Sequence, residues 1–579
     1  MPDGAGSVKD GDLPPILRVL LSQRGFDEDD QLECFLRPRL RGLRDPFELP
    51  EMDLAVRRIL EAVDAGERIC VFGDYDVDGI TSVAILSGLF SAYGVEAQTF
   101  IPIRGKEGYG LSDVAIERCL AVEPKPSLLV TVDCGTASGK QIERLAEEGI
   151  DVIVADHHET GEGGRPPAVA VVNPKLGDDY GYLCSAGVVF KLAHALLRTR
   201  QIEGVDSKLW LKEILDMVAV ATVADIVPLV EENRLLVRHG LQRLSQTSNH
   251  GLRALMEVSG MNGHATSSDV GFRIGPRINA AGRMDAPDDA LKALMADSAD
   301  EADRMARRLD DHNRDRQRIE REMHDQARAE LVRQGFDEAS DPVIVLGSRD
   351  WHPGVVGILA SRLMRQYHKP TFVISFNQPD GEDGLGKGSG RSITGVSLVK
   401  AIEACRSALE SGGGHHMAAG ISLREDQLEE FRAAFGDYVL NNTSPEDRGP
   451  ILNIDAEVSL EELSLGFLSS YELLQPFGSG NPQPVFMSRG VWPTESPRQV
   501  GTNHMRLSLR QGIQEKDAIY FGGWERDLPD PPWDVAFTID RNVFRGRVSL
   551  QVSVKDIRRA WSNCPESFRT TDILHCRLA

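Results

Sequence analysis

Three aspartates at alternate positions, Asp74, Asp76 and Asp78, follow an apolar run and precede a glycine. Carboxylates this close together repel one another unless a cation lies among them, and a divalent metal ion is the simplest such cation. An EF-hand calcium loop also alternates acids, but its twelfth position must be a glutamate, and here that position is Ile85. The motif therefore indicates a metal site that is not an EF-hand, and a solvated acidic turn is the alternative for this motif alone.

Three further segments carry residues of the same chemistry. Asp133 follows the apolar run SLLVTV, the triplet Asp156, His157 and His158 follows the run DVIVA, and Asp225 lies among apolar residues. Each aspartate has an ordinary alternative, because an aspartate in such a place also caps a helix or lies satisfied in a core. The carboxyl ends of parallel strands line one edge of a sheet, so we expect the groups that follow apolar runs to converge there.

Together these segments supply at least five carboxylates and two imidazoles, which is enough to hold two divalent ions. Oxygen ligands favour Mg2+, imidazole shifts the preference toward Mn2+, and no thiolate pattern indicates zinc. Two such ions close together stabilise an in-line displacement at phosphorus. The residue types therefore predict phosphoester hydrolysis.

The segments that must position these groups alternate between strand and helix. Short apolar runs are separated by stretches with helical periodicity, which is typical of a parallel sheet with helices on both faces. We expect helices over 53–63, 80–93 and 138–149, and strands over 68–73, 95–102, 128–133 and 151–156. The predicted fold class is α/β.

The rest of the chain divides at changes in composition. We expect an N-terminal tail and helical lead-in (1–50), the α/β domain (51–290), a long charged connecting helix (291–338), a second α/β domain (339–440) and a C-terminal part (441–579). Segments of the last part alternate apolar and polar residues at period two, which indicates a small β-barrel or sandwich.

Composition and charge exclude several classes of protein. With 41% hydrophobic and 26% charged residues the chain is globular, and no apolar run is long enough for a bilayer span. No secretory signal opens the sequence and the eight cysteines form no CxxC pair, so we expect a cytoplasmic protein with reduced thiols. Because 65 basic and 88 acidic residues give a net charge of −23, any contact with a polyanion must be local.

Two segments concentrate positive charge in this acidic chain. Residues 272–283 carry Arg273, Arg277 and Arg283 without an acid, and guanidinium groups bind phosphate bidentately. Residues 384–392 place a glycine at every second position before Arg391, a pattern that allows backbone N–H groups to close on an anion. Surface solubility and a flexible loop are the respective alternatives.

The motifs GDYDVDG, VDCG, ADHH and VADIVPL resemble the four motifs of the DHH phosphoesterase superfamily. The segments FRIGPRINAAGRM, WHPGVVGILASRL, GKGSGRSI, GGGHHMAAG and LQPFGSGNPQPVF further resemble the RecJ family of single-strand-specific exonucleases. The resemblance covers nearly the whole chain, from residue 15 to residue 558. Two small differences are Val77, where alanine is also usual, and the doubled His415 and His416, which leaves open which imidazole acts.

This resemblance implies a parallel-sheet DHH domain, a connecting helix, a DHH-associated domain that binds nucleic acid and a C-terminal OB-fold. It implies hydrolysis of single-stranded DNA from the 5′ end to 5′-mononucleotides with two Mn2+ or Mg2+ ions, in DNA repair and recombination. The implied partners are single-stranded DNA, a single-strand binding protein and a RecQ-type helicase, and the implied location is the bacterial cytoplasm, at the nucleoid.

Position by position, the resemblance implies three sets of site residues. The metal ligands are Asp76, Asp78, Asp133, His157 and Asp225. Asp74 and His158 are assigned to catalysis, Asp74 by holding a water or orienting a ligand, and His158 by ligating a metal or contacting the scissile phosphate. The substrate-binding residues are Arg104, Arg277, Asn279, Arg283, Ser389, Arg391 and His415, of which Arg104, Ser389 and Arg391 form a pocket for a 5′ phosphate.

Two other functions fit the sequence less well. One is a DHH phosphodiesterase acting on oligoribonucleotides or cyclic dinucleotides, but such enzymes usually resemble only the first two domains and lack the predicted barrel. The other is a non-catalytic replication or repair scaffold, against which the intact acids count. We expect single-strand preference to be steric, through a narrow passage between the two α/β domains.

Overall fold

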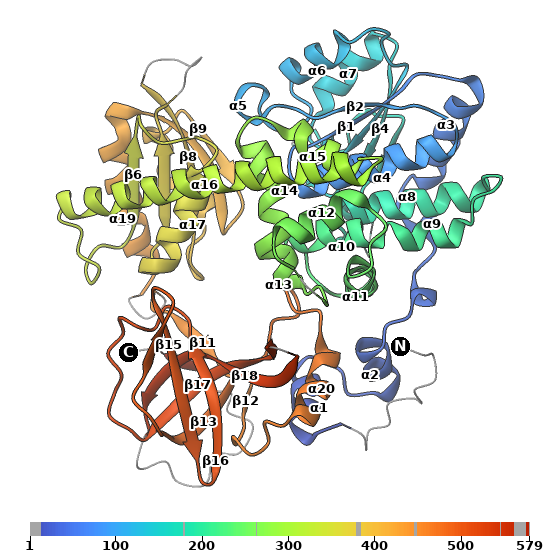
Figure 1. The fold of residues 1–579 in the computed structure, drawn as a ribbon. Coiled ribbons are helices and arrows are strands. Elements are labelled where there is room, and N and C mark those ends of the chain that lie inside the picture. The colour runs from blue at the N-terminus through green and yellow to red at the C-terminus, as the bar shows by residue number, and fades with distance from the viewer. Residues whose placement is uncertain are drawn as a thin grey trace. The chain divides into compact units, whose positions relative to one another are not determined.

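The computed structural model describes residues 13–161, 163–177, 180–261, 263–377, 384–444, 448–544, 546–560 and 575–577, with only the backbone described at 544 and 575–577 (Figure 1). The chain forms two compact units. One comprises residues 1–43, 228–238 and 451–579, and the other comprises residues 44–227 and 239–450. The predicted N-terminal tail and most of the predicted C-terminal tail lie outside the described residues.

A five-stranded parallel sheet carries the acidic motifs. Its strands are β1 (Ile69–Gly73), β2 (Gln98–Phe100), β3 (Leu128–Val132), β4 (Asp151–Ala155) and β5 (Ala170–Val172), in the order β2-β1-β3-β4-β5. Gly73 pairs with Val132 and Val132 with Ala155, so β1, β3 and β4 end side by side. The predicted parallel α/β fold is confirmed.

Helices cover both faces of this sheet (Figure 1). One face packs against α3 (Met52–Ala65), α4 (Val77–Ala92) and α8 (Ser185–Thr199). The other packs against α6 (Asp113–Leu120) and α7 (Gly139–Glu147), whose apolar side chains share a core with β1, β3 and β4. Nearly every residue of α4 is buried, which explains its almost continuous apolar sequence.

Shorter helices complete this domain. They are η3 (Pro46–Glu48), α5 (Arg104–Glu107), η4 (Pro174–Leu176), α9 (Ser207–Glu213), α10 (Leu215–Ala224), α12 (His250–Val258), α13 (Ser267–Asp269), η5 (Val270–Ile274), α14 (Gly275–Arg283) and α15 (Pro287–Leu294). Of α11 (Glu231–Leu244), only residues 239–244 belong to this unit. η5 is a turn of π-helix. Of these, α10, α14 and the short α5 carry residues singled out from the sequence.

The predicted connecting helix is α16 (Ala299–Arg333), 35 residues long. At 1.5 Å per residue it extends about 52 Å. Its first part packs against α12, α14 and α15, and its later part contributes Met323, Ala327 and Leu331 to the core of the second domain (Figure 1). Most of its charged side chains form ion pairs along the helix, for example Arg318 with Glu322.

The second α/β domain has a mixed five-stranded sheet. Its strands are β6 (Ile344–Ser348), β7 (Thr371–Ser375), β8 (Leu385–Arg391), β9 (Ser411–Gly414) and β10 (Ala418–Arg424), in the order β6-β7-β8-β10-β9, with only β6 and β7 parallel. Its helices are α17 (Val356–Tyr367), α18 (Leu398–Ala404), η6 (Arg406–Ala408), η7 (Glu425–Gln427) and α19 (Leu428–Asn442). α16 and α17 share one core with the sheet, and α18 and α19 share another.

The C-terminal part is a closed barrel. Five strands pair in a ring, in the order β13-β15-β16-β18-β17 and back to β13, as in an OB-fold. They are β13 (Phe486–Pro493), β15 (His504–Gln511), β16 (Gln514–Tyr520), β17 (Trp533–Phe544) and β18 (Arg547–Arg559). Further elements of this unit are β11 (Ile451–Asn453), β12 (Ala456–Glu457), α20 (Leu465–Tyr471), η8 (Glu472–Leu474), β14 (Arg498–Val500) and β19 (His575–Arg577). The predicted barrel is therefore confirmed.

The helical lead-in consists of α1 (Pro15–Gln23), α2 (Asp29–Leu36) and η2 (Leu40–Gly42), and it shares the apolar core of the barrel. Buried Arg234 joins residues 228–238 to this unit. Its guanidinium donates hydrogen bonds to the backbone carbonyls of Phe35, Leu473, Leu474 and Gln475. These carbonyls lie at the C-terminal ends of α2 and η8, where the helices themselves provide no partner, so the bonds prevent them from being buried unsatisfied.

Two expectations from composition concern cysteines and membrane spans. The cysteines whose side chains are described are free thiols, all buried except Cys34, while Cys564 and the side chain of Cys576 lie outside the described part. None of the helices that the structure describes combines the length and the apolar character needed to cross a bilayer.

We expect Asp216, a buried carboxyl group on α10, to make stability depend on pH. Burial raises its pKa to about 6, although Thr247 and the Met217 N–H donate hydrogen bonds to it. The folded state therefore holds a proton that the unfolded state loses near pH 4, so this group costs stability as the pH rises from 4 to 6. Urea unfolding of the wild type and D216N at pH 4.5 and 7.5 should show D216N gaining about 2–3 kcal/mol relative to the wild type at the higher pH. An equal difference at both pH values would contradict this assignment.

Candidate metal and substrate site

The acidic motifs meet at the carboxyl edge of the parallel sheet. Asp74 follows β1, Asp133 follows β3 and Asp156 follows β4, and the aligned ends of these strands bring the three carboxylates together. β1 and β3 are neighbours from which the chain winds in opposite directions, because β2 lies on one side and β4 on the other. Such a switch point is where open α/β sheets bind ligands.

The spacing of the first motif follows from the start of α4. Asp76 caps this helix by accepting hydrogen bonds from the backbone N–H groups of Asp78 and Gly79, at 2.9 and 3.2 Å. A Cβ on Gly79 would lie 2.4 Å from the carbonyl oxygen of Asp74, so only glycine allows the helix to start this close to the strand. The alternating acids are thus brought to one edge by a tight turn from strand to helix.

The N-terminus of α8 holds two of the carboxylates. The backbone N–H groups of Ser185 and Ala186 donate to Asp78 at 2.7 and 2.8 Å, and the Ser185 hydroxyl donates to Asp133 at 3.0 Å. Free N–H groups at a helix N-terminus stabilise negative charge. Ser185 was not predicted from the sequence, and a serine at the start of an apolar helical stretch was the only local signal for it.

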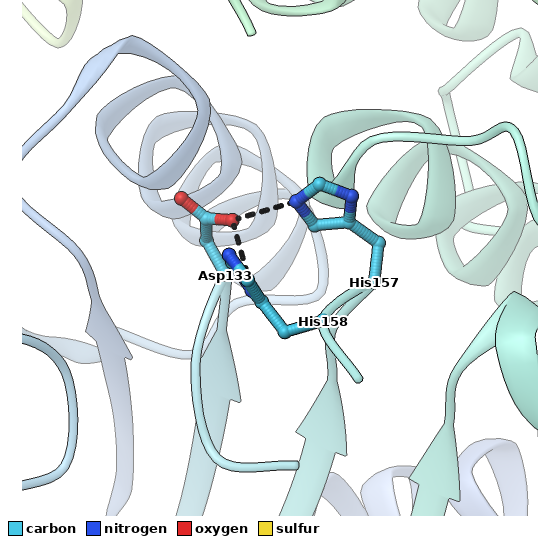
Figure 2. Close-up of side chains that lie close together, drawn as sticks. All are labelled: Asp133, His157 and His158. Carbon is cyan, nitrogen blue, oxygen red and sulfur yellow. Dashed lines mark ion pairs between the residues drawn. The ribbon is translucent and has the colours of Figure 1, made fainter. Parts of the chain in front are cut away.

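His157 lies at the centre of the acidic cluster. Its Nε2 atom is 3.4 Å from Asp133, 3.6 Å from Asp225 and 3.8 Å from Asp78, and it is buried without a hydrogen-bond partner among the described residues. Figure 2 shows His157 and His158 directed toward the same oxygen of Asp133. Asp225 comes from the C-terminal end of α10, so this helix supplies a ligand position that no strand end provides.

Donor atoms in this cluster form three groups with the spacing that a metal ion requires. They are Asp133 with His157 and His158, Asp78 with His157 and Asp225, and Asp74 with Asp76 and Asp133. The structure therefore brings together every residue predicted from the sequence as a metal ligand or assigned to catalysis. Asp133 belongs to two of the groups, as expected for a carboxylate shared between neighbouring ions.

The pKa shifts of the cluster are those of a site suited to bind cations. Burial, with the charge of Asp76 next in importance, raises the pKa of Asp78 to about 6, and burial together with Asp78 raises the pKa of Asp225 to about 8. Asp133 has its pKa raised for the same reasons, whereas burial lowers the pKa of His157 to about 4. Neutral imidazole and crowded carboxylates, with an orphaned buried nitrogen, are a donor set that suits Mn2+ or Mg2+.

His158 has a different environment from His157. Its Nδ1 atom lies 2.7 Å from Asp156, the Tyr109 hydroxyl lies 3.1 Å away, and the side chain is 41% exposed. Burial alone lowers its pKa, but the hydrogen bond with Asp156 and the charge of that carboxylate raise the pKa overall. Asp156 thus orients His158 and favours its protonated form, a role that the sequence did not assign to it.

A cluster of arginines lies beside the acids. The Arg104 guanidinium lies 5.2 Å from the centre of the Tyr75 ring, and Tyr75 stands between Asp74 and Asp76. Burial, with the charges of Arg104, Arg316 and Arg391, lowers the pKa of Arg283 to about 10. Like charges gathered in this way favour the binding of an anion. Arg316 on α16 was not predicted, because the regular charge pattern of that helix gives no reason to single it out.

The second domain contributes one side of this arginine cluster. Ser389 and Arg391 lie on β8, and a Cβ on Gly357, at the start of α17, would lie 3.4 Å from the Ser389 hydroxyl and 3.3 Å from an Arg391 nitrogen. Close approach of α17 to β8 therefore depends on this glycine. The cluster draws Arg104 and Arg283 from the first domain and Arg391 from the second, and Arg283 donates to the Gly354 carbonyl across the boundary at 3.0 Å.

The alternating glycines of β8 have a packing role instead of the expected role of closing on an anion. Gly386, Gly388 and Gly390 lie in a regular strand, and a Cβ on each would come within 2.8 Å of Phe376, Ile374 or Phe372, respectively. Aromatic and branched side chains thus fill the space above this face of the strand. Ser389 and Arg391, at the intervening positions, are left to face α17.

Three other predicted substrate-binding residues, Arg277, Asn279 and His415, lie outside the arginine cluster described above. Arg277 forms an ion pair with Asp310 of α16 at 2.9 Å, and Asn279 accepts a hydrogen bond from the Val77 N–H at 3.2 Å. His415 is exposed, and no partner of its ring is found among the described residues, whereas the His416 ring lies 2.8 Å from the Ser397 hydroxyl. Between the doubled histidines, His415 is therefore the one with an unengaged ring.

Comparison with known proteins identifies each domain. Residues 68–222 match the DHH family, N-terminal domain, residues 340–441 match the DHHA1 domain, and residues 454–556 match the RecJ OB domain. The chain is 35% identical over 554 residues to the single-stranded-DNA-specific exonuclease RecJ of Bacillus subtilis, covering 94% of this chain and 68% of that protein. It is 35% identical over 576 residues to the Escherichia coli protein of the same name, covering 94% and 96%.

Solved structures agree with these matches. The structure of RecJ from Thermus thermophilus in complex with Mn2+ superimposes with a TM-score of 0.78 at 32% identity, covering 95% of this chain and 79% of that one. The corresponding complex with Mg2+ gives a TM-score of 0.73 at 30% identity, covering 95% and 78%.

We expect Mn2+ to stabilise the protein through Asp133. Adding Mn2+ to EDTA-treated wild type should raise its melting temperature, because cations relieve the repulsion among the carboxylates. At a concentration 100-fold above Kd, the free energy of unfolding should increase by about 2.7 kcal/mol. D133N should show little of this shift, since Asp133 contributes to two of the three donor groups. The matched control is D216N, which removes another buried carboxylate of the same unit and should respond to Mn2+ as the wild type does. An equal shift in D133N and wild type would contradict the predicted site.

Proposed function

Because the chain belongs to the RecJ family of single-stranded-DNA-specific exonucleases, we propose that it hydrolyses single-stranded DNA from the 5′ end and releases 5′-mononucleotides. One observation supports this activity above all others. The Arg104 guanidinium lies over the ring of Tyr75, whose sequence neighbours Asp74 and Asp76 belong to the cluster of carboxylates and imidazoles, and the charge of Arg104 acts on Asp74. A phosphate bound by the arginines therefore places the next phosphodiester near the acidic cluster.

The acidic cluster performs the hydrolysis. Asp76, Asp78, Asp133, His157 and Asp225 would hold the metal ions, and Asp74, which accepts a hydrogen bond from the Gly110 N–H, would orient them or a water molecule. When bound, a pair of divalent cations supplies positive charge at the scissile phosphate and acidifies the attacking water. The N–H groups of α8 keep Asp78 fixed throughout, so the ligands need little reorganisation.

The arginine cluster provides 5′-end recognition. Arg104, Arg283, Arg391 and the Ser389 hydroxyl would bind the 5′ phosphate, and Arg316 adds to the positive charge around it. A guanidinium remains charged and binds phosphate bidentately, whereas a 5′ hydroxyl end offers no charge in return. Because this pocket adjoins the acidic cluster, the strand enters by its 5′ end and one nucleotide lies between the pocket and the cleaved bond.

His158 acts on the phosphate that is cleaved. Asp156 and Tyr109 orient its ring, and the hydrogen bond and charge of Asp156 raise its pKa despite burial, so it would donate a hydrogen bond to a phosphate oxygen or a proton to the leaving oxygen. His157, whose pKa is lowered, serves instead as a neutral ligand. The two adjacent histidines thus have separate tasks.

The alternative substrates are less well supported than single-stranded DNA, and the partners and cellular role are supported only by the resemblance. The match of residues 454–556 to the RecJ OB domain favours single-stranded DNA over short oligoribonucleotides and cyclic dinucleotides. A single-strand binding protein and a RecQ-type helicase as partners, a role in repair and recombination at the nucleoid, and steric exclusion of duplex between the two α/β domains remain predictions from the resemblance.

The activity is tested with single-stranded DNA labelled at either end, incubated with Mn2+, Mg2+ or EDTA. We expect the 5′ label to be released first as a mononucleotide with either metal and no release in EDTA. D133N should lose at least about 100-fold in kcat, because a shared carboxylate is removed from the metal site. Faster hydrolysis of an oligoribonucleotide or a cyclic dinucleotide than of DNA would replace the proposed substrate, and undiminished turnover by D133N would exclude the mechanism.

The role of the arginine cluster is tested by R391A. We expect the wild type to prefer 5′-phosphorylated over 5′-hydroxyl DNA in kcat/KM, and R391A to lose most of that preference, since a charge-assisted hydrogen bond contributes about tenfold or more. The rate on 5′-hydroxyl DNA should change little. R333A, which removes a mostly exposed arginine at the end of α16, is the matched control. A preference retained in full by R391A would show that the 5′ phosphate binds elsewhere.

A further inference from the structure

Two large apolar side chains, Phe272 and Ile226, are strongly exposed near the acidic cluster, and the function proposed above does not use them. Phe272 is 77% exposed, more than any other aromatic side chain in the described part of the chain, and Ile226 is 72% exposed. A single exposed apolar residue needs no explanation. These two are unusual because of their backbone conformations and their shared location.

Ile226 is held in a strained conformation beside a predicted metal ligand. Its φ of 63° lies in the left-handed region, which is unfavourable for a β-branched residue. It directly follows Asp225, whose carboxylate is 3.6 Å from His157. A glycine would relieve the strain, and exposure to solvent gives an isoleucine no compensating stabilisation. The side chain is therefore retained at a cost to stability, as is common at functional sites.

Phe272 lies in the π-helical turn η5, which leads directly into α14. Turns of π-helix are rare in proteins, and many of those that occur lie at functional sites. η5 packs against α10, and a Cβ on Gly275 would lie 3.5 Å from the Cβ of Ala224, the last residue of α10. Phe272 and Ile226 therefore both belong to the junction between the end of α10 and the start of α14.

From this junction α14 leads past the acidic cluster to the arginine cluster. Asn279 binds the backbone of Val77 at the start of α4, and Arg283 is part of the arginine cluster. Arg283 lies eleven positions after Phe272, which corresponds to about 16 Å along a helix. A strand whose 5′ phosphate lies in the arginine cluster and whose first phosphodiester lies at the acidic cluster therefore reaches Phe272 within a few nucleotides.

We propose that Phe272 and Ile226 form an apolar platform on which bases of the single strand stack, downstream of the cleaved bond. This proposal rests on the proposed function and adds a chemical source of single-strand preference. Unpaired bases have free faces that stack on an aromatic ring whatever their sequence, whereas bases within a duplex are already stacked on their neighbours. The neighbouring Arg273 pairs with Asp269 at 3.5 Å, but its side chain is 48% exposed and would exchange this partner for a phosphate between such bases.

The test measures the first cleavage of 5′-phosphorylated single-stranded DNA with Mn2+. The 5′ nucleotide carries the label, and one abasic residue is placed in turn at each of the following positions. On intact DNA, F272A should lower kcat/KM for release of the first nucleotide about tenfold, the effect expected from losing one base–aromatic stack. At one abasic position near the 5′ end, kcat/KM of the wild type should fall by the same factor of about ten relative to intact DNA. The abasic residue at that position should not lower kcat/KM of F272A any further, because the stack is already lost. Additive losses at every abasic position would overturn the platform.

Further variants separate stacking from other effects of the substitution. F272L keeps an apolar side chain without a flat ring and should fall between the wild type and F272A. I226G should lower kcat/KM while leaving the melting temperature unchanged or higher, because glycine tolerates the positive φ. V332A removes another strongly exposed apolar side chain, on the last turn of α16, and should leave kcat/KM unchanged. Unchanged kcat/KM in both F272A and I226G would overturn the proposal. The same holds if sedimentation shows that either variant alters self-association while kcat/KM stays unchanged in both.

Failure of this proposal differs from failure of the proposed function. A wild type that releases no nucleotide from single-stranded DNA with Mn2+ or Mg2+ would remove the function itself. A wild type that cleaves normally, together with an F272A variant that shows no coupling to any abasic position, would remove only the platform.

Discussion

Repulsion among buried carboxylates is the constraint on which this structure depends. Asp74, Asp78 and Asp133 are almost fully buried within one cluster, and their pKa values are raised because water cannot screen them there. The N–H groups of α8 and the Ser185 hydroxyl offset part of this cost, and the orphaned nitrogen of His157 offsets none of it. Protons relieve part of the remaining repulsion, as the raised pKa values indicate, and bound divalent cations would relieve it while keeping the carboxylates charged, which is why the arrangement fits Mn2+ or Mg2+.

Two clusters of opposite charge, side by side, allow an acidic protein to act on a polyanion. The chain carries a net charge of −23, so its overall field repels DNA. Cations bound by the carboxylates would reverse the local sign, and the arginines around Arg283 already supply positive charge; burial and these neighbouring charges together lower the pKa of Arg283. Attraction is thereby confined to one place, which favours binding of a strand end over nonspecific adsorption.

Sequence reasoning was most successful where one residue type had one physical use. Apolar runs predicted the strands, and acids after those runs predicted a cluster, because parallel strands share one carboxyl edge. The glycines before Arg391 were misinterpreted because a glycine serves equally for anion binding and for close packing, and only the side chains of Phe372, Ile374 and Phe376 distinguish the two. Ser185, Tyr109 and Arg316 were missed because their importance comes from neighbours distant in sequence.

The sequence by itself determined the α/β class, the order of the domains and the identity of the acids and imidazoles, because periodicity and residue chemistry are local properties. Tertiary structure alone decided how these groups differ in charge and task. The adjacent residues His157 and His158 have opposite pKa shifts. Burial, with the charge of His158, lowers the pKa of His157, whereas the hydrogen bond with Asp156 and its charge outweigh burial and raise the pKa of His158. Likewise, the arginine cluster exists only because α17 and β8 pack beside Arg283, so residues far apart in sequence share one low-dielectric space.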